Sequence, residues 1–385
     1  MGLSVLLTPA GRAALEAAAP LAEGDELAAA STLRRRFDPT VAAIALTQAR
    51  LRVRARAKFG ERASGMFFTR AGLEQATRPV VAARRAARLL SGGVARVADL
   101  GCGIGSDLFY LRGTGIESDR QTALCASLNV PSAQVIHGDV RDFNLSTVDA
   151  AFCDPARRTA SRRIFDPADY SPPWDWLLGL VSAIPRTVLK LAPGIDQEAL
   201  PAGCELELVS VDGEVVEAAA WCGPLAEVPR RATVIRGDVA HQLTGTGLSP
   251  APVGQPAGYI YDPDGAVVRS HLVASLAEIM GGVVADPTIA YVWSDRAVES
   301  PFGRCFAVDE VMPFSLKRLR AALRARGVGR LEILKRGSPL SPDTLRSQLK
   351  LSGDASASLL LTRVAGHPVA VIATPVPKIP QFARQ

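Results

Sequence analysis

The chain has 385 residues, 48% of them hydrophobic and 21% charged, so it is not mostly disordered, and its length predicts two or three domains. The formal net charge of +6 hides an uneven distribution: residues 1–100 carry a net +8, residues 101–310 a net −12 and residues 311–385 a net +10. Two basic ends therefore flank an acidic middle, and each end is a candidate for binding a polyanion.

Residues 1–90 are predicted to form a helical N-terminal region, because apolar residues and alanines recur there at helical spacing. The predicted helices cover residues 11–19, 40–57 and 73–90. The second of them carries five cations that do not share one face, namely Arg50, Arg52, Arg54, Arg56 and Lys58. These cations form either a solvated helix surface or a surface that contacts phosphate.

From residue 94 strands and helices alternate, which is typical of a parallel sheet covered by helices. Strands are predicted at residues 94–100, 115–116, 133–137, 148–153 and 187–191, and helices at residues 106–112, 119–128 and 174–184. Asp212-Gly213 then separates two β-rich runs, residues 204–211 and 214–221, and this dipeptide is typical of a tight hairpin. The predicted fold over residues 91–236 is thus an α/β domain whose parallel sheet ends in an antiparallel hairpin, with one more strand at residues 232–236.

The remaining segment is predicted to hold a linker and small α+β units. Residues 237–257 are rich in Gly, Pro, Ser and Thr, and we interpret them as a linker or long loop. Two units follow, at residues 258–312 and 313–385. Their predicted strands are at residues 259–261, 289–293, 330–335, 358–363 and 367–374, and their predicted helices at residues 271–280, 316–326 and 341–349.

The cysteines and the N-terminal sequence indicate in which cellular compartment the protein is expected. The six cysteines are scattered singly without a C-x-x-C pair, so we expect neither a metal site nor a redox motif. The N-terminus does not resemble a secretory signal, and no run reaches the ~18 apolar residues of a membrane span. We therefore expect a soluble cytoplasmic protein.

The strongest chemical signal is a glycine-rich loop after the first predicted strand. Asp99 ends that strand, and Gly101, Gly103 and Gly105 follow at alternate positions before a helix. Such glycines let the backbone approach a ligand closely, and amides at a helix start favour an anionic or polar group. The pattern D-x-G-x-G-x-G, which includes Cys102, resembles motif I of the class I S-adenosylmethionine (SAM) methyltransferases. This resemblance implies that the loop holds SAM.

Two acids at the ends of the next strands are candidates for cofactor binding. Glu117 lies 18 residues after Asp99, and a carboxylate can accept both hydroxyls of a ribose. Asp139, followed by Val140, resembles the acid that accepts the adenine amino group in this family. The alternative for Asp139 is a cap of the turn that follows.

The segment Asp154-Pro155-Ala156-Arg157 ends the fourth strand, where ligands of open α/β sheets bind. It resembles motif IV of amine-directed methyltransferases, which reads D/N-P-P followed by an aromatic residue that stacks on a flipped base. Asp154 is therefore a candidate for orienting the acceptor, with a turn-capping role as the alternative. Ala156 and Arg157 depart from the motif, so Arg157 is a candidate for stacking on a base or binding phosphate. A basic loop continues with Arg158, Arg162 and Arg163.

Three further residues are candidates for the site. Phe68 and Thr69 resemble a segment that closes over SAM in related methyltransferases, with core packing as the alternative. Lys190 lies near the carboxyl end of the fifth strand and is a candidate for facing the substrate. Cys153 lies inside a predicted strand, which disfavours the thiol attack that pyrimidine C5 methylation requires.

The order of these motifs resembles a bacterial family of SAM-dependent methyltransferases with a C-terminal THUMP-like domain. The matching segments are residues 67–69 (FFT), 73–77 (LEQAT), 99–103 (DLGCG), 154–157 (DPAR), 189–194 (LKLAPG), 259–263 (YIYDP) and 301–306 (PFGRCF). The resemblance implies that residues 91–236 form a Rossmann-like SAM-binding domain, residues 258–312 a ferredoxin-like unit and residues 313–385 a THUMP-like domain. Because THUMP domains are implicated in RNA binding, it also implies an RNA substrate.

The C-terminal segment carries a cluster of cations that suits such a substrate, because phosphate neutralisation dominates nonspecific nucleic-acid affinity. The cluster comprises Lys317, Arg318, Arg320, Arg324, Arg326, Arg330, Lys335 and Arg336, with only Glu332 opposing it in sequence. A solvated basic surface is the alternative. We expect a SAM-dependent methyltransferase that acts on RNA, at a nitrogen atom near residues 154–157. The alternatives are a noncatalytic RNA-binding protein that retains the SAM-binding fold, and a protein-directed methyltransferase. An NAD(P) oxidoreductase is disfavoured, because no catalytic Tyr-Lys or His arrangement accompanies the glycine-rich loop.

Overall fold

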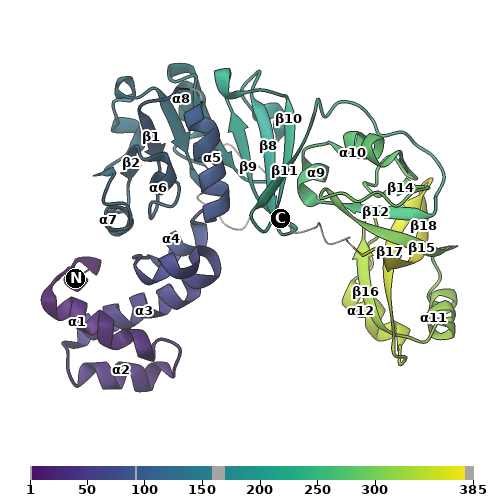
Figure 1. The fold of residues 1–385 in the computed structure, drawn as a ribbon, viewed down its shortest axis with the longest axis horizontal. Coiled ribbons are helices and arrows are strands. Elements are labelled where there is room, and N and C mark those ends of the chain that lie inside the picture. Colours follow the sequence, from purple (N-terminus) through teal and green to yellow (C-terminus); the bar gives the residue numbers. More distant parts are fainter. Residues whose placement is uncertain (1, 92, 158–169, 378–385) are drawn as a thin grey trace, which may run out of the picture. The chain divides into compact units, whose positions relative to one another are not determined.

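The structure, a computed structural model, describes residues 2–91, 93–157 and 170–377 (Figure 1). The chain divides into two compact units. The first comprises residues 1–204 and 219–226, and the second comprises residues 205–218 and 227–385. Within the described residues, no helix has the length and apolarity that a membrane span requires.

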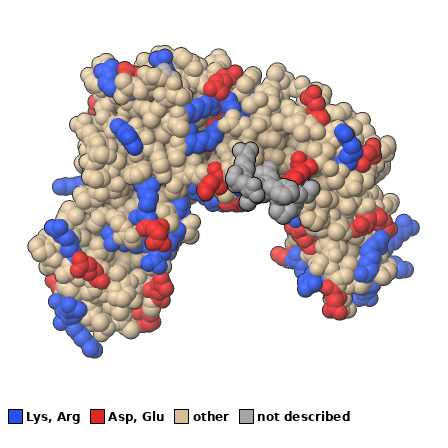
Figure 2. Space-filling view, viewed as in Figure 1, with Lys and Arg blue, Asp and Glu red and all other residues tan. Residues whose placement is uncertain are grey.

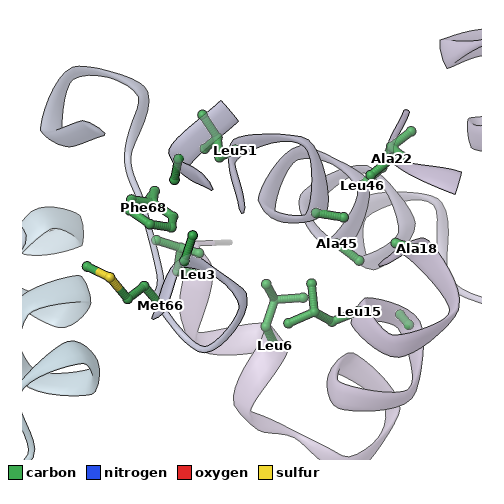
Figure 3. Close-up of a cluster of buried hydrophobic side chains, with 14 of the residues drawn as sticks. Leu3, Leu6, Leu15, Ala18, Ala22, Ala45, Leu46, Leu51, Met66 and Phe68 are labelled. Atoms are coloured by element: carbon green, nitrogen blue, oxygen red, sulfur yellow. The ribbon is translucent and has the colours of Figure 1, made fainter. Parts of the chain in front are cut away.

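The helical N-terminal region is confirmed at the start of the first unit. Its elements are η1 (Leu3–Leu7), α1 (Pro9–Ala18), η2 (Ala19–Leu21), α2 (Glu26–Arg34), α3 (Pro39–Phe59) and η3 (Gly60–Ser64). Short polar side chains begin three helices, because Thr8, Asp25 and Asp38 accept hydrogen bonds from amides of the first turns. The apolar faces of these helices enclose a core that includes Leu15 and Leu46 (Figure 3).

The single helix predicted over residues 73–90 is wrong, because two helices take its place. These are α4 (Arg70–Gln75) and α5 (Pro79–Ser91). Ala76 leaves the helical conformation with a ψ of 134°. Pro79 begins the next helix, and a proline disfavours helical backbone in the residue before it, here Arg78. The break leaves Thr77 on a short connection between the two helices.

The predicted parallel sheet is confirmed in the first unit (Figure 1). Its strands follow the order β7 (Thr187–Leu191), β4 (Ala150–Cys153), β1 (Val97–Leu100), β2 (Thr114–Glu117) and β3 (Gln134–His137). Strand β9 (Glu214–Trp221), of which residues 219–221 belong to this unit, neighbours β7. The strands from β7 to β3 run parallel. Because β1 and β4 are hydrogen-bonded neighbours, the segments that follow them emerge at the same edge of the sheet.

Short helices and turns connect these strands. They are α6 (Leu108–Leu111), α7 (Arg120–Asn129), α8 (Trp174–Ala183), η4 (Val140–Asp142), η5 (Leu145–Thr147), η7 (Gln197–Ala199) and η8 (Gly223–Leu225). Helices α5 and α6 pack on the sheet through Leu89 and Leu111, which share an apolar cluster with Phe152 and Val188. After β4, the backbone forms a short antiparallel pair of β5 (Ala156–Arg157) and β6 (Tyr170–Ser171).

The second unit begins with three strands, β8 (Glu205–Val211), β10 (Arg230–Arg236) and β11 (Val239–Gly245). Strand β10 pairs with β8 in parallel and with β11 in antiparallel orientation. The interpretation of residues 237–257 as a linker or long loop is therefore wrong for Val239–Gly245. This strand has few apolar residues because it ends the strand order and most of its side chains are exposed.

A second sheet fills the rest of this unit. Its strand order is β13 (Val283–Val284), β14 (Val292–Ser294), β12 (Tyr259–Pro263), β15 (Gly303–Pro313), β18 (His367–Pro375), β17 (Ala355–Val364) and β16 (Val328–Lys335). The helices of this region are α9 (Gly265–Arg269), α10 (Val273–Met280), α11 (Leu316–Ala325) and α12 (Pro342–Leu349). Leu319 of α11 and Leu345 of α12 pack in one cluster with Leu359 of β17.

The long strand β15 is the element of this sheet that the sequence does not predict. It pairs with β12 on one side and with β18 on the other. The two small units predicted at residues 258–312 and 313–385 thus contribute strands to one sheet. The final hairpin forms as predicted around Ala365-Gly366, where both residues have positive φ.

Candidate active site

The glycine-rich loop follows β1, and two of its glycines shape it. Gly101 has a φ of +85°, and a Cβ there would lie 3.0 Å from the backbone carbonyl oxygen of Asp154. Gly103 has a φ of +56°, and a Cβ there would meet no atom within 4 Å. Cys102 and Gly105 are buried, and burial raises the pKa of the Cys102 thiol. The loop therefore approaches Asp154 closely and leaves open space beside Gly103.

Glu117, at the end of β2, is anchored to this loop. Its Oε2 accepts a hydrogen bond from the amide of Gly103 at 3.0 Å, and its Oε1 accepts one from the amide of Asp119 at 2.8 Å. Asp119 in turn caps α7 by accepting from the amide of Thr122 at 2.8 Å. Glu117 is half-buried, so its backbone partners hold it while its oxygens keep lone pairs for a ligand hydroxyl.

Asp139 lies after β3, where its own chain engages its carboxylate. Oδ1 accepts from the Arg141 amide at 2.9 Å, and both oxygens accept from the Arg141 guanidinium. These hydrogen bonds from Arg141 lower the pKa of Asp139 to about 2. The turn-capping alternative thus describes its contacts in the structure. Adenine recognition by Asp139 and its buried neighbour Val140 stays a prediction.

Asp99 is a buried acid directly before the loop, with 1% of its surface exposed. Within the described residues, neither of its carboxylate oxygens has a hydrogen-bond partner. Burial, followed by the charges of Asp107 and Asp154, raises the pKa of Asp99 well above its ordinary value, and Arg85 and Lys190 oppose this shift. A carboxylate in such surroundings ionises readily only when a cation compensates it.

An ion pair that was not predicted from the sequence lies near the loop, between α5 and the start of α6. Arg85 of α5 pairs with Asp107, just before α6, and their side chains are 2% and 8% exposed. The Arg85 guanidinium also lies 4.3 Å from the centre of the Phe152 ring. The sequence does indicate that Arg85 is buried, because it interrupts the apolar face that Val81 and Leu89 define on this helix.

The structure brings Asp154 and Lys190 together near the carboxyl ends of β4 and β7. Lys190 Nζ donates to Asp154 Oδ2 at 2.6 Å and to the Thr77 hydroxyl at 3.2 Å. The Asp154 and Lys190 side chains are 32% and 15% exposed, so the pair borders solvent. Two residues predicted separately as catalytic candidates therefore form one hydrogen-bonded group, and Thr77 is a third member that the sequence did not single out.

The other candidates after β4 are described only in part. Pro155 is buried, and the backbone of Arg157 lies in β5. Arg158, Arg162 and Arg163 lie outside the described residues. Substrate contacts from Arg157 and from this basic loop stay predictions.

For Phe68 the structure favours the core-packing alternative over a cofactor lid. Phe68 is fully buried in the helical core, with its ring centre 5.9 Å from that of Phe59 (Figure 3). The Gln48 amide accepts from the backbone N–H of Phe68 and donates to its carbonyl oxygen. Thr69 begins α4, and its hydroxyl lies 3.4 Å from that of Thr122, so its lid role stays a prediction.

These residues fit SAM as a cofactor. SAM is cationic at its sulfonium and ammonium groups and carries a ribose diol. The open space beside Gly103 accommodates a ligand, the Glu117 carboxylate suits the diol, and the unpartnered Asp99 carboxyl suits a cationic group. When bound, SAM supplies an electrophilic methyl group on its sulfonium.

Glu117→Gln is expected to weaken SAM binding by about 10- to 100-fold, because a hydrogen bond to a charged group contributes about 1.5–3 kcal/mol. Isothermal titration calorimetry with SAM measures this loss. Glu26→Gln is the matched control, because the Glu26 side chain is 72% exposed on α2. Equal affinities of the Glu117 variant and the wild type would contradict a role of Glu117 in binding the ribose.

Comparisons with known proteins relate these features to a family. The family described as THUMP domain-like matches residues 303–375, and a domain of unknown function matches residues 2–55. Relatives from two Mycobacterium tuberculosis strains, CDC 1551 and H37Rv, are named uncharacterized S-adenosylmethionine-dependent methyltransferases. Each is 37% identical over 344 residues, which cover 82% of this chain and 90% of the relative.

A crystal structure from Porphyromonas gingivalis W83, classed with the methyltransferases, shares the fold. It aligns with a TM-score of 0.76 and covers 98% of this chain and 100% of that chain, at 24% identity. That likeness concerns the fold, whereas the identity to the mycobacterial relatives shows the family. The chain therefore belongs to the S-adenosylmethionine-dependent methyltransferases and carries a C-terminal THUMP-like domain.

Proposed function

We propose that this methyltransferase transfers the methyl group of SAM to a nitrogen atom of RNA beside Asp154. The observation that carries the RNA assignment is a set of cations on α11, inside the segment that matches the THUMP domain-like family. These cations are Lys317, Arg318, Arg320 and Arg324. Phosphate contacts from such side chains supply most of the nonspecific affinity for nucleic acid.

Lys317 and Arg318 of α11 are more available than the other cations of the C-terminal cluster. On the same helix, Arg320 and Arg324 donate to the carbonyl oxygens of Gln348 and Lys350. Two basic residues of the C-terminal cluster pair with acids that lie far away in sequence, namely Arg326 with Glu310 and Arg336 with Asp262. Glu332, the one acid within the cluster, pairs with Arg304 instead. Lys317 and Arg318 are exposed and form no ion pair within the described residues, and Figure 2 shows Lys and Arg side chains gathered over α11.

Helix α3 of the basic N-terminal segment offers fewer cations to a polyanion, because each of its five cations already has a partner. Its ion pairs are Arg50 with Glu26, Arg54 with Glu74 and Arg56 with Glu23. Arg52 donates to the carbonyl oxygen of Met66, and Lys58 donates to three carbonyl oxygens near the end of α4. We therefore assign phosphate binding to α11 rather than to α3.

Asp154 is suited to orient the acceptor nitrogen. Lys190 occupies Oδ2, whereas Oδ1 accepts no hydrogen bond within the described residues. Oδ1 can accept an N–H of the acceptor, and the carboxylate can take up the proton that leaves this nitrogen when it gains a methyl group. Lys190 holds the carboxylate in one orientation during this step.

Incubation of the protein with methyl-labelled SAM and cellular RNA tests the proposal. We expect label in RNA, and nucleoside analysis should place the methyl group on a base nitrogen. Label in added protein but not in RNA would overturn the RNA assignment and favour the protein-directed alternative. Binding of SAM without label in either acceptor would favour a noncatalytic RNA-binding protein.

A double variant on α11 completes this test. Lys317→Ala with Arg318→Ala should weaken RNA binding about tenfold or more at moderate salt and reduce the salt dependence, because two phosphate contacts are lost. SAM affinity should stay unchanged. Arg346→Ala is the matched control, because Arg346 on α12 pairs with the neighbouring Asp343 at the surface. Equal RNA affinity in both variants would contradict phosphate binding by α11.

A further inference from the structure

The first unit contains only two lysines, and both bind one short segment. Six of the 44 basic residues of the chain are Lys, and Lys58 and Lys190 are the two that fall in this unit. Lys58 donates to backbone carbonyls at residues 73–76, and Lys190 donates to the hydroxyl of Thr77 directly after them. The two ammonium groups thus hold consecutive parts of the connection between α4 and α5.

Lys58 makes a three-point contact that suits an ammonium group. Its Nζ donates to the carbonyl oxygens of Leu73 at 2.7 Å, Glu74 at 3.2 Å and Ala76 at 2.9 Å. The last carbonyls of a helix have no helical partner, so Lys58 satisfies the end of α4. An ammonium offers three donors around one atom, whereas the planar fork of arginine cannot converge on three carbonyls in this way.

Lys58 also acts on its surroundings by charge. Burial, followed by the charges of Lys190 and Arg78, lowers the pKa of Lys58, and the charge of Glu74 opposes this shift. The two lysines are therefore coupled electrostatically as well as through the segment between them. A change at Lys58 is expected to reach Lys190 by both routes.

Other side chains of α3 hold the preceding part of the same segment. Gln48 makes both backbone hydrogen bonds of Phe68, and Arg52 donates to the carbonyl oxygen of Met66 at 2.9 Å. On its other side the segment lies against the glycine-rich loop, because a Cβ on Gly72 would lie 2.4 Å from Ile104 Cγ2. Residues 66–77 are thus held between α3 and the predicted cofactor loop.

We propose that Lys58 is a positioning residue of the active site, which sets the Lys190–Asp154 ion pair through the α4–α5 connection and Thr77. The inference rests on the proposed role of Asp154. Most of α3 lies in the segment that matches the domain of unknown function. The proposal assigns this helix a role in positioning the residues that contact the methyl acceptor.

Acylation of Lys190 tests this inference without relying on methyl transfer. N-succinimidyl acetate reacts with accessible amines, and mass spectrometry can follow Lys190 because the chain has six lysines. Lys58→Arg keeps the charge but not the three-point contact, and Thr77→Val removes the oxygen that Lys190 contacts. We expect both variants to raise the acylation rate of Lys190 at least threefold, and Thr77→Ser to restore the wild-type rate.

Two further variants make the result decisive. Arg56→Met is the matched control on α3, because Arg56 is 60% exposed and pairs with Glu23 at the surface. Asp154→Asn removes the negative partner of Lys190 and should also raise its rate. An unchanged rate in Lys58→Arg or in Thr77→Val would overturn the proposal, and so would an equal rise in Arg56→Met, which would indicate general loosening of α3.

Kinetics then distinguish positioning from a purely structural role. If RNA is methylated, Lys58→Arg should lower kcat several-fold and leave the melting temperature and the SAM affinity near wild-type values. A loss confined to thermal stability or to SAM affinity would contradict positioning of Asp154. If the wild type methylates no RNA, the proposed function fails, while the acylation rates still decide whether Lys58 controls Lys190.

Discussion

Asp154→Asn is expected to lower the rate of RNA methylation by about 10²- to 10⁴-fold, the range for loss of a positioned proton acceptor. The amide is isosteric with the carboxylate but cannot take up the proton of the acceptor nitrogen. It also removes the negative partner of Lys190, whose Nζ lies 2.6 Å from Oδ2. Single-turnover transfer of labelled methyl groups to RNA measures this loss.

SAM affinity separates this effect from damage to the cofactor site. The Asp154 side chain is not part of the glycine-rich loop, so calorimetry should give a Kd for SAM within about twofold of the wild type. Asp149→Asn is a suitable control, because Asp149 pairs with Arg96 at the surface. Unchanged turnover in Asp154→Asn would refute the proposed role of Asp154.

Arg85→Met is expected to destabilise the first unit by about 3–5 kcal/mol, because removing one partner of a buried ion pair leaves a charge uncompensated. The pair is largely shielded from solvent, since its side chains are only 2% and 8% exposed. Asp99, which Arg85 also stabilises in its ionised form, would lose a nearby cation. In this variant the carboxyl groups of Asp99 and Asp107, which lie near the glycine-rich loop, both lose the nearby charge of Arg85.

Urea unfolding followed by tryptophan fluorescence measures this change, because Trp174, Trp176 and Trp221 report on the first unit. Arg96→Met is the matched control: its ion pair with Asp149 is exposed, and its unfolding midpoint should stay close to that of the wild type. A similar midpoint for both variants would contradict the structural importance of the Arg85–Asp107 pair. Asp107→Asn combined with Arg85→Met should recover part of the loss.

Local patterns predict the elements of the first sheet well. The strand ends and the glycine-rich loop depend on contiguous residues, so β1, β2 and β4 can be located from the sequence to within a few residues. It fails where a strand depends on its neighbours. Val239–Gly245 is polar because it ends the strand order, and Gly303–Pro313 carries few signals of its own although it has a partner on both sides.

The residues of the candidate site also fall into those that can be predicted from the sequence and those that depend on the fold. Glu117 ends a strand and Asp154 directly follows one, so both are found by counting along the chain. The structure places both next to the glycine-rich loop. The contacts of Lys58 cannot be predicted by counting along the chain. Its partners are backbone carbonyl oxygens at the end of another helix, and every residue has such an oxygen whatever its side chain. Similarly, Arg336 is counted among free cations until the fold brings it to Asp262.

The placement of β15 limits how the C-terminal domain can be exchanged between proteins. The THUMP domain-like match begins at residue 303, the first residue of β15, and β12 pairs with this strand on the edge that the match leaves out. A module cut at that boundary would expose a long unpaired edge, which invites aggregation. Recombination that keeps this sheet intact has to carry residues 259–375 together, so the transferable unit is larger than the recognisable domain.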